Sequence, residues 1–398
     1  MVRVTLSGSR CGGPEGVGEG AAMRQRRRGV MTLLAVVAGG VTVLGACATP
    51  PRPGGVASQK AAAIGVPAGG RIGVILPDKA SSTRWETADK PFLAAAFTTA
   101  GVDFDIRNAE GDAAKFVSIA DELISQGAGV LMIANLDSDS GTEVIRRAAS
   151  AGIPVIDYDR LTLGGGAKYY VSFDNVAVGT AIGKSIVKSL QAAGKRTGNV
   201  VELDGSPTDN NAAQLKTGYD AVIRAAGYTV VGSAPVPAWD DKLAVGVFRK
   251  LYTKAEGKVD AVAAANDGLG GAAVQVLAEH DLAGKVPVTG QDATDAALQR
   301  VILGTQTMTV YKAIKLEADA AAKLAIAMIK GDSAGADRQA SRSVQHQQSG
   351  TYVKAVLLQP RTIEIGTVKE VIADRYTTTN KLCATAQLRA ACSRAGLI

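Results

Sequence analysis

Polar and aromatic side chains suited to holding a small molecule recur directly after short apolar runs of this sequence. Carboxylate, amide and guanidinium groups are hydrogen-bond partners for hydroxyls, and an indole face packs against the C–H face of a pyranose ring. Aromatic residues are only 4% of the chain, yet both tryptophans belong to the set. The candidate residues are Arg84, Trp85, Asp159, Arg160, Asn210, Trp239, Asn266, Asp292 and Lys312. We predict that they line one site for a hydroxyl-rich ligand.

A second interpretation stays open for each position. Asp and Asn favour turns and helix N-caps whether or not a ligand is present. Trp85 and Trp239 are also large apolar side chains that a core can absorb. The recurrence of polar groups after seven separate apolar runs favours the site.

Short β-branched runs alternate with longer amphipathic stretches from Arg71 onward, a pattern that predicts an α/β fold of doubly wound parallel sheets. The predicted strands are Ile72–Leu76, Val130–Ile133, Val155–Asp157, Tyr169–Ser172, Val200–Leu203, Val259–Ala264 and Val286–Thr289. The predicted helices include Ala114–Ser125, Thr142–Ser150, Ala177–Ala193, Ala212–Ala226, Leu243–Lys254, Gly271–Glu279 and Ala313–Ile329. In such sheets ligands bind beyond the carboxyl ends of the strands, where the candidate residues fall.

The motifs of several catalytic classes are missing from the sequence. The two histidines, His280 and His346, have no metal-ligand partner at useful spacing, so we expect neither a metal nor a cofactor. Residues 179–185 (GTAIGKS) have one residue too few between the glycines for a phosphate loop and continue a helical pattern. Carboxylates such as Asp159, Asp267 and Asp292 could carry out acid–base chemistry, but amides or cations flank each of them. Binding without reaction is therefore favoured over an exported sugar-processing enzyme, which remains the alternative.

The N-terminus has the features of an export signal. An arginine cluster at 24–28 precedes an uncharged run from Val30 to Leu44, and small residues follow it. A short membrane anchor is the alternative interpretation. Removing residues 1–46, with six Arg and two Glu, lowers the formal net charge from +7 to +3. A charge that small on a chain this long gives no reason to expect nucleic acid as a partner.

The cysteines fit export as well. After removal of residues 1–46, Cys47, Cys383 and Cys392 remain. The last two would form a disulfide outside the cell, with two unpaired thiols as the alternative. Residues 47–69 are rich in Pro, Gly, Ala and Ser, which predicts a flexible tether.

Two resemblances give these features a context. Leu44-Gly45-Ala46-Cys47 resembles the lipobox of bacterial lipoproteins, which implies a lipidated Cys47 and a protein anchored to the outer face of the cell membrane. From about Arg71 to about Arg375 the chain resembles the bacterial xylose-binding proteins of the type I periplasmic sugar-binding family, which serves ABC importers. The runs that carry this resemblance are STRW at 82–85, YDR at 158–160, SFDN at 172–175, GSPTDNNA at 205–212, GQDA at 290–293 and GTQTMTVYK at 304–312.

The second resemblance implies a fold and a function. Two lobes would be joined by a three-strand hinge, the N-terminal lobe being residues 70–174 plus 312–357 and the C-terminal lobe 175–311 plus 358–382, with 383–398 as a tail. A monomer would bind one monosaccharide, D-xylose, by hinge closure and deliver it to the permease subunits of the importer. Glucose, galactose or arabinose are alternative ligands. A transcriptional repressor with this core would need a basic helix-turn-helix in place of the lipobox.

The resemblance also assigns the nine candidate residues to the cleft between the lobes. It leaves open whether Asn210 or Asn211 occupies the amide position of the GSPTDNNA run. The chain departs from the family at Asp157, where a small residue is common, and in the cysteine-bearing tail past Asn380. The first departure could alter the sugar preference, whereas the second concerns stability.

Overall fold

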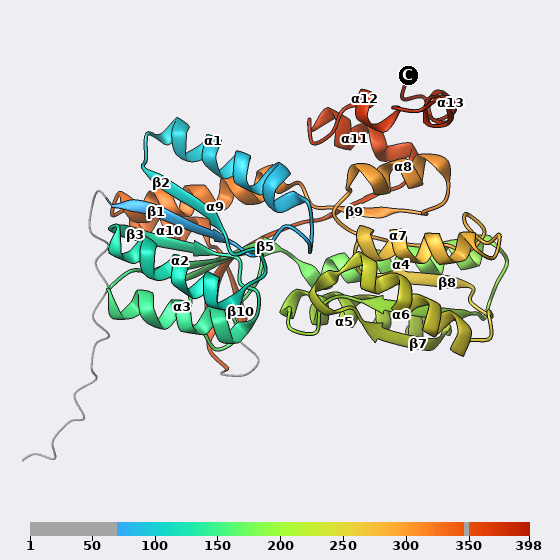
Figure 1. The fold of residues 1–398 in the computed structure, drawn as a ribbon, viewed down its shortest axis with the longest axis horizontal. Coiled ribbons are helices and arrows are strands. Elements are labelled where there is room, and N and C mark those ends of the chain that lie inside the picture. The colour runs from blue at the N-terminus through green and yellow to red at the C-terminus, as the bar shows by residue number, and fades with distance from the viewer. Residues whose placement is uncertain (1–69, 346–349) are drawn as a thin grey trace, which may run out of the picture. The chain divides into compact units, whose positions relative to one another are not determined.

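The computed structural model describes residues 70–345 and 350–398 (Figure 1). The predicted signal peptide, Cys47 and the tether lie outside the described residues. The strands are β1 Arg71–Leu76, β2 Phe104–Asn108, β3 Ala128–Ile133, β4 Val155–Tyr158, β5 Tyr169–Phe173, β6 Asn199–Asp204, β7 Thr229–Pro235, β8 Ala261–Ala264, β9 Thr309–Tyr311, β10 Arg342–Gln345, β11 Tyr352–Leu358 and β12 Arg361–Ile363. The α-helices are α1 Lys90–Ala100, α2 Ala113–Ser125, α3 Ser138–Ser150, α4 Asn175–Ala192, α5 Asn210–Ala225, α6 Asp241–Lys254, α7 Asp267–Ala278, α8 Asp295–Leu303, α9 Ile314–Ile329, α10 Ser333–Gln339, α11 Val368–Ala373, α12 Thr379–Leu382 and α13 Ala386–Arg394.

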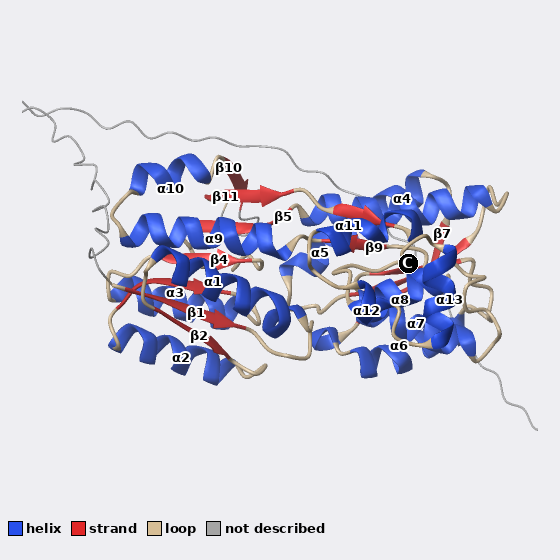
Figure 2. Ribbon diagram, turned by 90° about the horizontal axis from the view of Figure 1, so that it is seen from above, coloured by secondary structure: helices blue, strands red, loops and turns tan. Residues whose placement is uncertain are grey.

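The N-terminal lobe is built on a seven-stranded sheet of order β10-β11-β5-β4-β3-β1-β2. Its pairs are parallel except β10 with β11. Figure 2 shows the order from β10 and β11 at one edge to β2 at the other. Helices α1 and α9 bury apolar side chains against one face of this sheet, and α2 and α3 against the other (Figure 1). This lobe is doubly wound, as predicted.

The C-terminal lobe contains a three-stranded parallel sheet of order β7-β6-β8 and an antiparallel pair, β9 with β12. Helix α4 packs against α5, and α6 against α7. A β-carbon added to Gly179 would lie 2.0 Å from the Leu215 carbonyl oxygen, so this glycine allows α4 to approach α5 closely. The GTAIGKS run is therefore part of a helix and a helix–helix contact, not a phosphate loop.

The chain passes three times between the part built on the seven-stranded sheet and the part built on the smaller sheets. The passages follow β5 at Phe173, β9 at Tyr311 and β11 at Leu358. The residues around all three are thus shared between lobes, a topology that permits the lobes to rotate about a hinge.

One predicted strand is wrong. Val286–Thr289 forms only isolated bridges, Val262 with Val288 and Ala283 with Val286. Pro287 in the middle of the segment has no backbone N–H, so the segment cannot complete a ladder. The segment still runs beside β8, so Gln291 and Asp292, which follow it, lie near the carboxyl end of that strand.

Residues 364–398 form a C-terminal appendage in which α12 and α13 pack against α8 (Figure 1). Cys383 and Cys392 are joined by a disulfide, as the cysteine count predicted. Their side chains are buried with Leu298 and Ile302 of α8. Within residues 70–345 and 350–398, no helix is long and apolar enough to cross a membrane.

Candidate ligand-binding site

A narrow cavity lies where loops from the carboxyl ends of the strands meet. Its lining residues are polar or aromatic: Ser81, Ser82, Arg84, Trp85, Asp159, Arg160, Asn175, Asp209, Asn211, Trp239, Asn266, Gln291, Asp292 and Lys312. Most of them follow β1, β4 and β5 of the N-terminal lobe or β6, β7, β8 and β9 of the C-terminal lobe, and Gln291 and Asp292 follow the 286–289 segment beside β8. The cavity is thus at the sheet edge where α/β proteins bind ligands.

Eight of the nine predicted site residues line this cavity, and Asn210 does not. Asn210 is the first residue of α5, and Asn211 follows it about 100° further round the helix. The Asn211 side chain therefore faces the cavity, where its Nδ2 donates to Asp159 Oδ1 at 3.1 Å. Asn211 replaces Asn210 in the candidate site.

Arg84 is fixed by carboxylates rather than left free for a ligand. Its Nε and Nη2 donate to Asp89 at 2.8 and 2.7 Å, and Nη2 also donates to Glu317 at 2.8 Å. Its Nη1 donates to Asp159 at 2.8 Å. Arg84 is 2% exposed, and Asp89 and Glu317 are fully buried. Of the five guanidinium N–H groups, these contacts leave one for a ligand.

Asp159 and Lys312 lie at the centre of the lining. Lys312 Nζ is 3.5 Å from Asp159 Oδ2 and 3.3 Å from Asp292 Oδ1. Burial alone would raise the pKa of Asp159, but Lys312, Arg84 and Arg160 together lower it below its ordinary value. Burial likewise acts to lower the pKa of Lys312, and its carboxylate partners raise it. Both groups are therefore charged at neutral pH.

The two tryptophans come from different lobes, Trp85 after β1 and Trp239 after β7, and are linked through Arg160 and Asp209. The Arg84 and Arg160 guanidinium carbons are 4.5 and 5.4 Å from the Trp85 ring centroid. Arg160 Nε is 3.1 Å from Asp209 Oδ2, which also accepts from Trp239 Nε1 at 3.1 Å. Since Arg160 follows β4 and Asp209 follows β6, this chain of contacts connects the lobes.

The position of Trp239 depends on a glycine. A β-carbon added to Gly205, directly after β6, would lie 2.1–2.4 Å from three atoms of the Trp239 ring. Trp239 itself has a φ of 57°, in the left-handed region that non-glycine residues seldom occupy. Such a conformation persists where the surroundings fix it, often at a functional site.

The lining is balanced in charge. Three cations, Arg84, Arg160 and Lys312, face three carboxylates, Asp159, Asp209 and Asp292. The remaining polar groups are amides and hydroxyls, which both donate and accept hydrogen bonds. This composition suits a neutral ligand rich in hydroxyls better than an anion or a cation.

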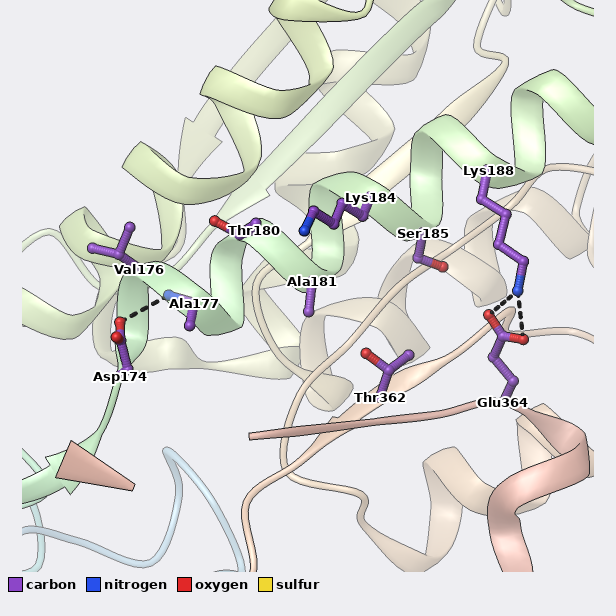
Figure 3. A pocket seen from close by; sticks show the side chains of 10 residues that line it. All are labelled: Asp174, Val176, Ala177, Thr180, Ala181, Lys184, Ser185, Lys188, Thr362 and Glu364. Carbon is purple, nitrogen blue, oxygen red and sulfur yellow. Dashed lines mark hydrogen bonds and ion pairs between the residues drawn. The ribbon is translucent and has the colours of Figure 1, made fainter. Parts of the chain in front are cut away.

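A larger and more open groove lies along α4. It is lined by residues of α4 and by Thr362 and Glu364. Figure 3 shows α4 side chains facing Thr362 and Glu364, with Lys188 Nζ 2.8 Å from a Glu364 carboxylate oxygen. Its lining includes no aromatic residue, and its two anions already have partners: Asp174 accepts from the Ala177 N–H, and Glu364 is paired with Lys188. The groove therefore lacks the stacking surface and the buried charges of the cavity.

Sequence comparison identifies the family. Residues 72–333 match the family described as periplasmic binding protein domain, which is more than half of the chain. The chain belongs to the periplasmic binding protein family. The resemblance stated from the sequence is thus confirmed, and the fold is that of a type I periplasmic binding protein.

Relatives of known function are similar over most of their length. The chain is 34% identical over 300 residues to the D-xylose-binding periplasmic protein of Haemophilus influenzae, covering 74% of this chain and 87% of that one. It is 31% identical to the protein of the same name from Escherichia coli, covering 76% and 89%. Among solved structures, an ABC transporter solute binding protein from Clostridium phytofermentans with bound β-D-glucose has a TM-score of 0.70 and 28% identity, covering 78% and 99%.

The sequence left Asn211 open as the alternative to Asn210 and missed five lining residues of this binding protein: Ser81, Ser82, Asn175, Asp209 and Gln291. Asp209, Asn211 and Gln291 stand in runs that did predict the site, so a wider selection within those runs would have found them. Ser82 and Asn175 also stand in such runs, STRW and SFDN, whereas Ser81 carries no sequence signal beyond following β1.

Asp157, where the sequence suggested a departure from the family, is not a lining residue of the cavity. It is fully buried and accepts from the backbone N–H and the hydroxyl of Thr162, both at 2.8 Å. Asn135 Nδ2 donates to Thr162 Oγ1 at 2.8 Å and to the Arg160 carbonyl at 3.2 Å. Asp157 thus supports the loop that carries Arg160.

The titration of Asp157 predicts a pH-dependent stability. Burial raises the pKa of Asp157 to about 7, because its effect is larger than that of the two Thr162 hydrogen bonds, which lower the pKa. The native state then retains a proton that the unfolded state loses near pH 4, so stability falls as pH rises from about 4 to 7. Between pH 5 and pH 8, Asp157→Asn should gain about 2–3 kcal/mol of unfolding free energy relative to wild type.

Urea denaturation of both proteins at pH 5, 6, 7 and 8 measures this difference. Glu202 and Asp267, whose pKa values are also raised to about 7 by burial, are present in both proteins and cancel in the comparison. Parallel pH profiles for wild type and variant would show that Asp157 does not titrate in this range.

Proposed function

We propose that this chain is the extracytoplasmic solute-binding protein of an ABC sugar importer and that it binds one monosaccharide, D-xylose, by hinge closure. The observation that carries the proposal is the charge-balanced cavity lined by one tryptophan from each lobe. Neutral sugars present hydroxyls that need both donors and acceptors, together with an apolar C–H face for stacking. The residues proposed to bind the sugar are Arg84, Trp85, Asp159, Arg160, Asn211, Trp239, Asn266, Asp292 and Lys312.

Two buried oxygens support a hydroxyl-bearing ligand. Within the described part of the chain, Gln291 Oε1 and Asp292 Oδ1 accept no hydrogen bond, although Asp292 Oδ1 is 3.3 Å from Lys312 Nζ. Buried acceptors without a donor are costly, and sugar hydroxyls would supply the donors. Both oxygens belong to lining residues.

Binding without chemistry fits the charge states of the cavity. A glycosidase needs one protonated carboxyl as general acid, with a raised pKa. Asp159 has the opposite shift, with burial outweighed by Lys312, Arg84 and Arg160. Asp267 has a raised pKa, but its oxygens accept from Thr294 and Gln306, and it is not a lining residue. An exported sugar-processing enzyme is therefore the weaker proposal.

Contacts across the cavity support the closure mechanism. Ser82 Oγ donates to Asp292 Oδ2 at 3.2 Å, and Asn211 Nδ2 donates to the Asp159 carbonyl at 3.0 Å. Both contacts join a residue of one lobe to a residue of the other. A sugar that contacts both walls only when they meet shifts the population toward the closed form, which the permease would recognise.

The preference for D-xylose is supported by the two relatives named for that sugar, at 34% and 31% identity. Glucose is the second candidate, because the similar structure from Clostridium phytofermentans contains β-D-glucose. Galactose and arabinose follow as related aldoses.

A thermal-shift screen tests the proposal. D-xylose at about a hundredfold over its Kd should stabilise the protein by roughly 2.7 kcal/mol and raise Tm by roughly 3–8 °C. The panel includes glucose, galactose, arabinose and ribose, and recovery of unchanged sugar checks for the absence of a reaction. A protein that no sugar stabilises, or that converts sugar to product, would refute the proposal.

The membrane anchor is proposed from the sequence alone. Acylation of Cys47 should hold the exported protein in the membrane fraction, and Cys47→Ala should move it to the soluble extracytoplasmic fraction. Fractionation with immunodetection measures the shift. A wild-type protein recovered from the soluble fraction would contradict the anchor and leave the sugar-binding proposal intact.

A further inference from the structure

The loop that carries Asp292 is held in an unusual conformation. Asp292 and Ala293 have φ values of 98° and 51°, two consecutive non-glycine residues with positive φ. The Asp292 N–H donates to the Val310 carbonyl at 2.8 Å, and the Ala293 N–H donates to Thr309 Oγ1 at 3.1 Å. Strained backbone of this kind persists only where its surroundings fix it. The backbone carbonyl of Asp292 accepts a hydrogen bond from a side chain of the C-terminal appendage.

That side chain is Tyr376. Its hydroxyl donates to the Asp292 carbonyl at 3.3 Å. Its ring centroid is 5.2 Å from that of Tyr311, at an interplanar angle of 55°. Tyr311 directly precedes Lys312, whose Nζ is 3.3 Å from Asp292 Oδ1. One tyrosine therefore contacts the backbone of one lining residue and the neighbour of another.

The appendage is itself attached to the helix that follows this loop. Thr377 Oγ1 donates to Asp295 at the start of α8, and Gln299 Nε2 of α8 donates to the Lys381 carbonyl at 2.9 Å. The disulfide between Cys383 and Cys392 closes the segment that packs on α8. Tyr376 is thus held from both sides, by the strand before Lys312 and by the appendage beyond it.

We infer that Tyr376 is a positioning residue of the ligand site, through which the C-terminal appendage orients Asp292 and Lys312. The inference rests on the proposed function. It gives the appendage a role in affinity, where the sequence predicted a role in stability alone. Tyr376 is not among the cavity-lining residues, so it acts through Asp292 and the ring of Tyr311.

Tyr376→Phe tests the inference, because it removes the hydroxyl and keeps the stacked ring. Tyr228→Phe is the matched control, since Tyr228 also donates its hydroxyl to a carbonyl, that of Lys195 at 2.8 Å, and is not a lining residue. D-xylose is titrated into each full-length protein by calorimetry, with Tm measured alongside. We expect Kd to rise about 3–10-fold in Tyr376→Phe, with the number of sites unchanged, and to stay at the wild-type value in Tyr228→Phe.

The number of sites separates positioning from folding. A purely structural role would lower the fraction of protein able to bind, and so the number of sites, while Kd stayed constant. That result, or an equal rise of Kd in both variants, would overturn the inference. A wild-type Kd in Tyr376→Phe would overturn the inference alone. If the wild-type protein itself gave no heat with D-xylose or the other sugars of the panel, the proposed function would have failed.

Discussion

Replacing Arg84 by methionine is expected to lower the free energy of unfolding by about 3–5 kcal/mol and to weaken sugar binding at least about a hundredfold. Arg84 is the shared partner of three buried carboxylates, those of Asp89, Asp159 and Glu317. Methionine fills a similar volume but removes the cation that these three carboxylates share. Removing one member of a buried ion pair strands the other in a medium that cannot solvate it.

The Arg84→Met substitution should lower both stability and sugar affinity, and separate measurements distinguish the two effects. Burial raises the pKa of Glu317 even beside Arg84, which lowers it, so without Arg84 this pKa would rise further. Asp159 would keep Lys312 as a partner but lose the 2.8 Å bond that orients its Oδ2. Urea denaturation reports the first effect and calorimetric titration the second.

Arg146→Met is the matched control, because Arg146 also makes a two-point contact with a carboxylate, Glu143, but on the exposed surface of α3. It should leave stability and affinity almost unchanged, since solvent screens exposed pairs. If Arg84→Met were as stable as Arg146→Met, the buried charge cluster would not have the role described for it.

Replacing Trp239 by alanine is expected to weaken sugar binding by about 1–3 kcal/mol, or roughly 5–150-fold in Kd, by analogy with stacking losses on other aromatic platforms. The indole is 7% exposed, lines the cavity and donates to Asp209. Its removal takes away one wall and also frees Asp209, the partner of Arg160 across the cavity.

Trp239 also contributes to the apolar core of its lobe, so the variant should lose about 3–5 kcal/mol of stability as well. Phe248→Ala controls for that loss, because Phe248 is fully buried in the same core and is not a lining residue. It should destabilise the fold and leave Kd unchanged. A wild-type Kd for Trp239→Ala would remove this residue from the site.

Gly205→Ala displaces the same indole without deleting it. The new methyl would overlap the Trp239 ring, so we expect weaker sugar binding in the folded protein. Gly246→Ala in α6 is the control, since a β-carbon there meets no atom within 4 Å. Equal affinities for the two glycine variants would show that the indole's position does not matter for binding.

Most of the site could be predicted because parallel α/β folds bring the ends of distant strands together. Arg84, Asp159 and Lys312 are far apart in the sequence, yet each follows a strand end and lies in one cluster. The alternative interpretation of Asn266 is also correct: its Oδ1 caps α7 by accepting from the Leu269 N–H at 2.9 Å. Capping and lining the cavity coexist in this residue, so the two interpretations do not exclude each other.

The rest depended on details that spacing does not encode. Asn210 and Asn211 differ only in the direction in which the helix points them, and that direction follows from where α5 begins. The sequence predicts only that Glu317 lies in a largely apolar helix. Its contact with Arg84 becomes visible in the tertiary structure. Tyr376 contacts Asp292 from 84 residues away, through an appendage whose packing no periodicity indicated.

Calorimetric titration of the full-length protein with D-xylose is the most direct test of the proposed sugar binding between the two lobes. The account predicts a saturable exothermic or endothermic signal fitted by one site per chain, with the sugar recovered unchanged afterwards. An absence of heat with D-xylose, glucose, galactose and arabinose alike would contradict it.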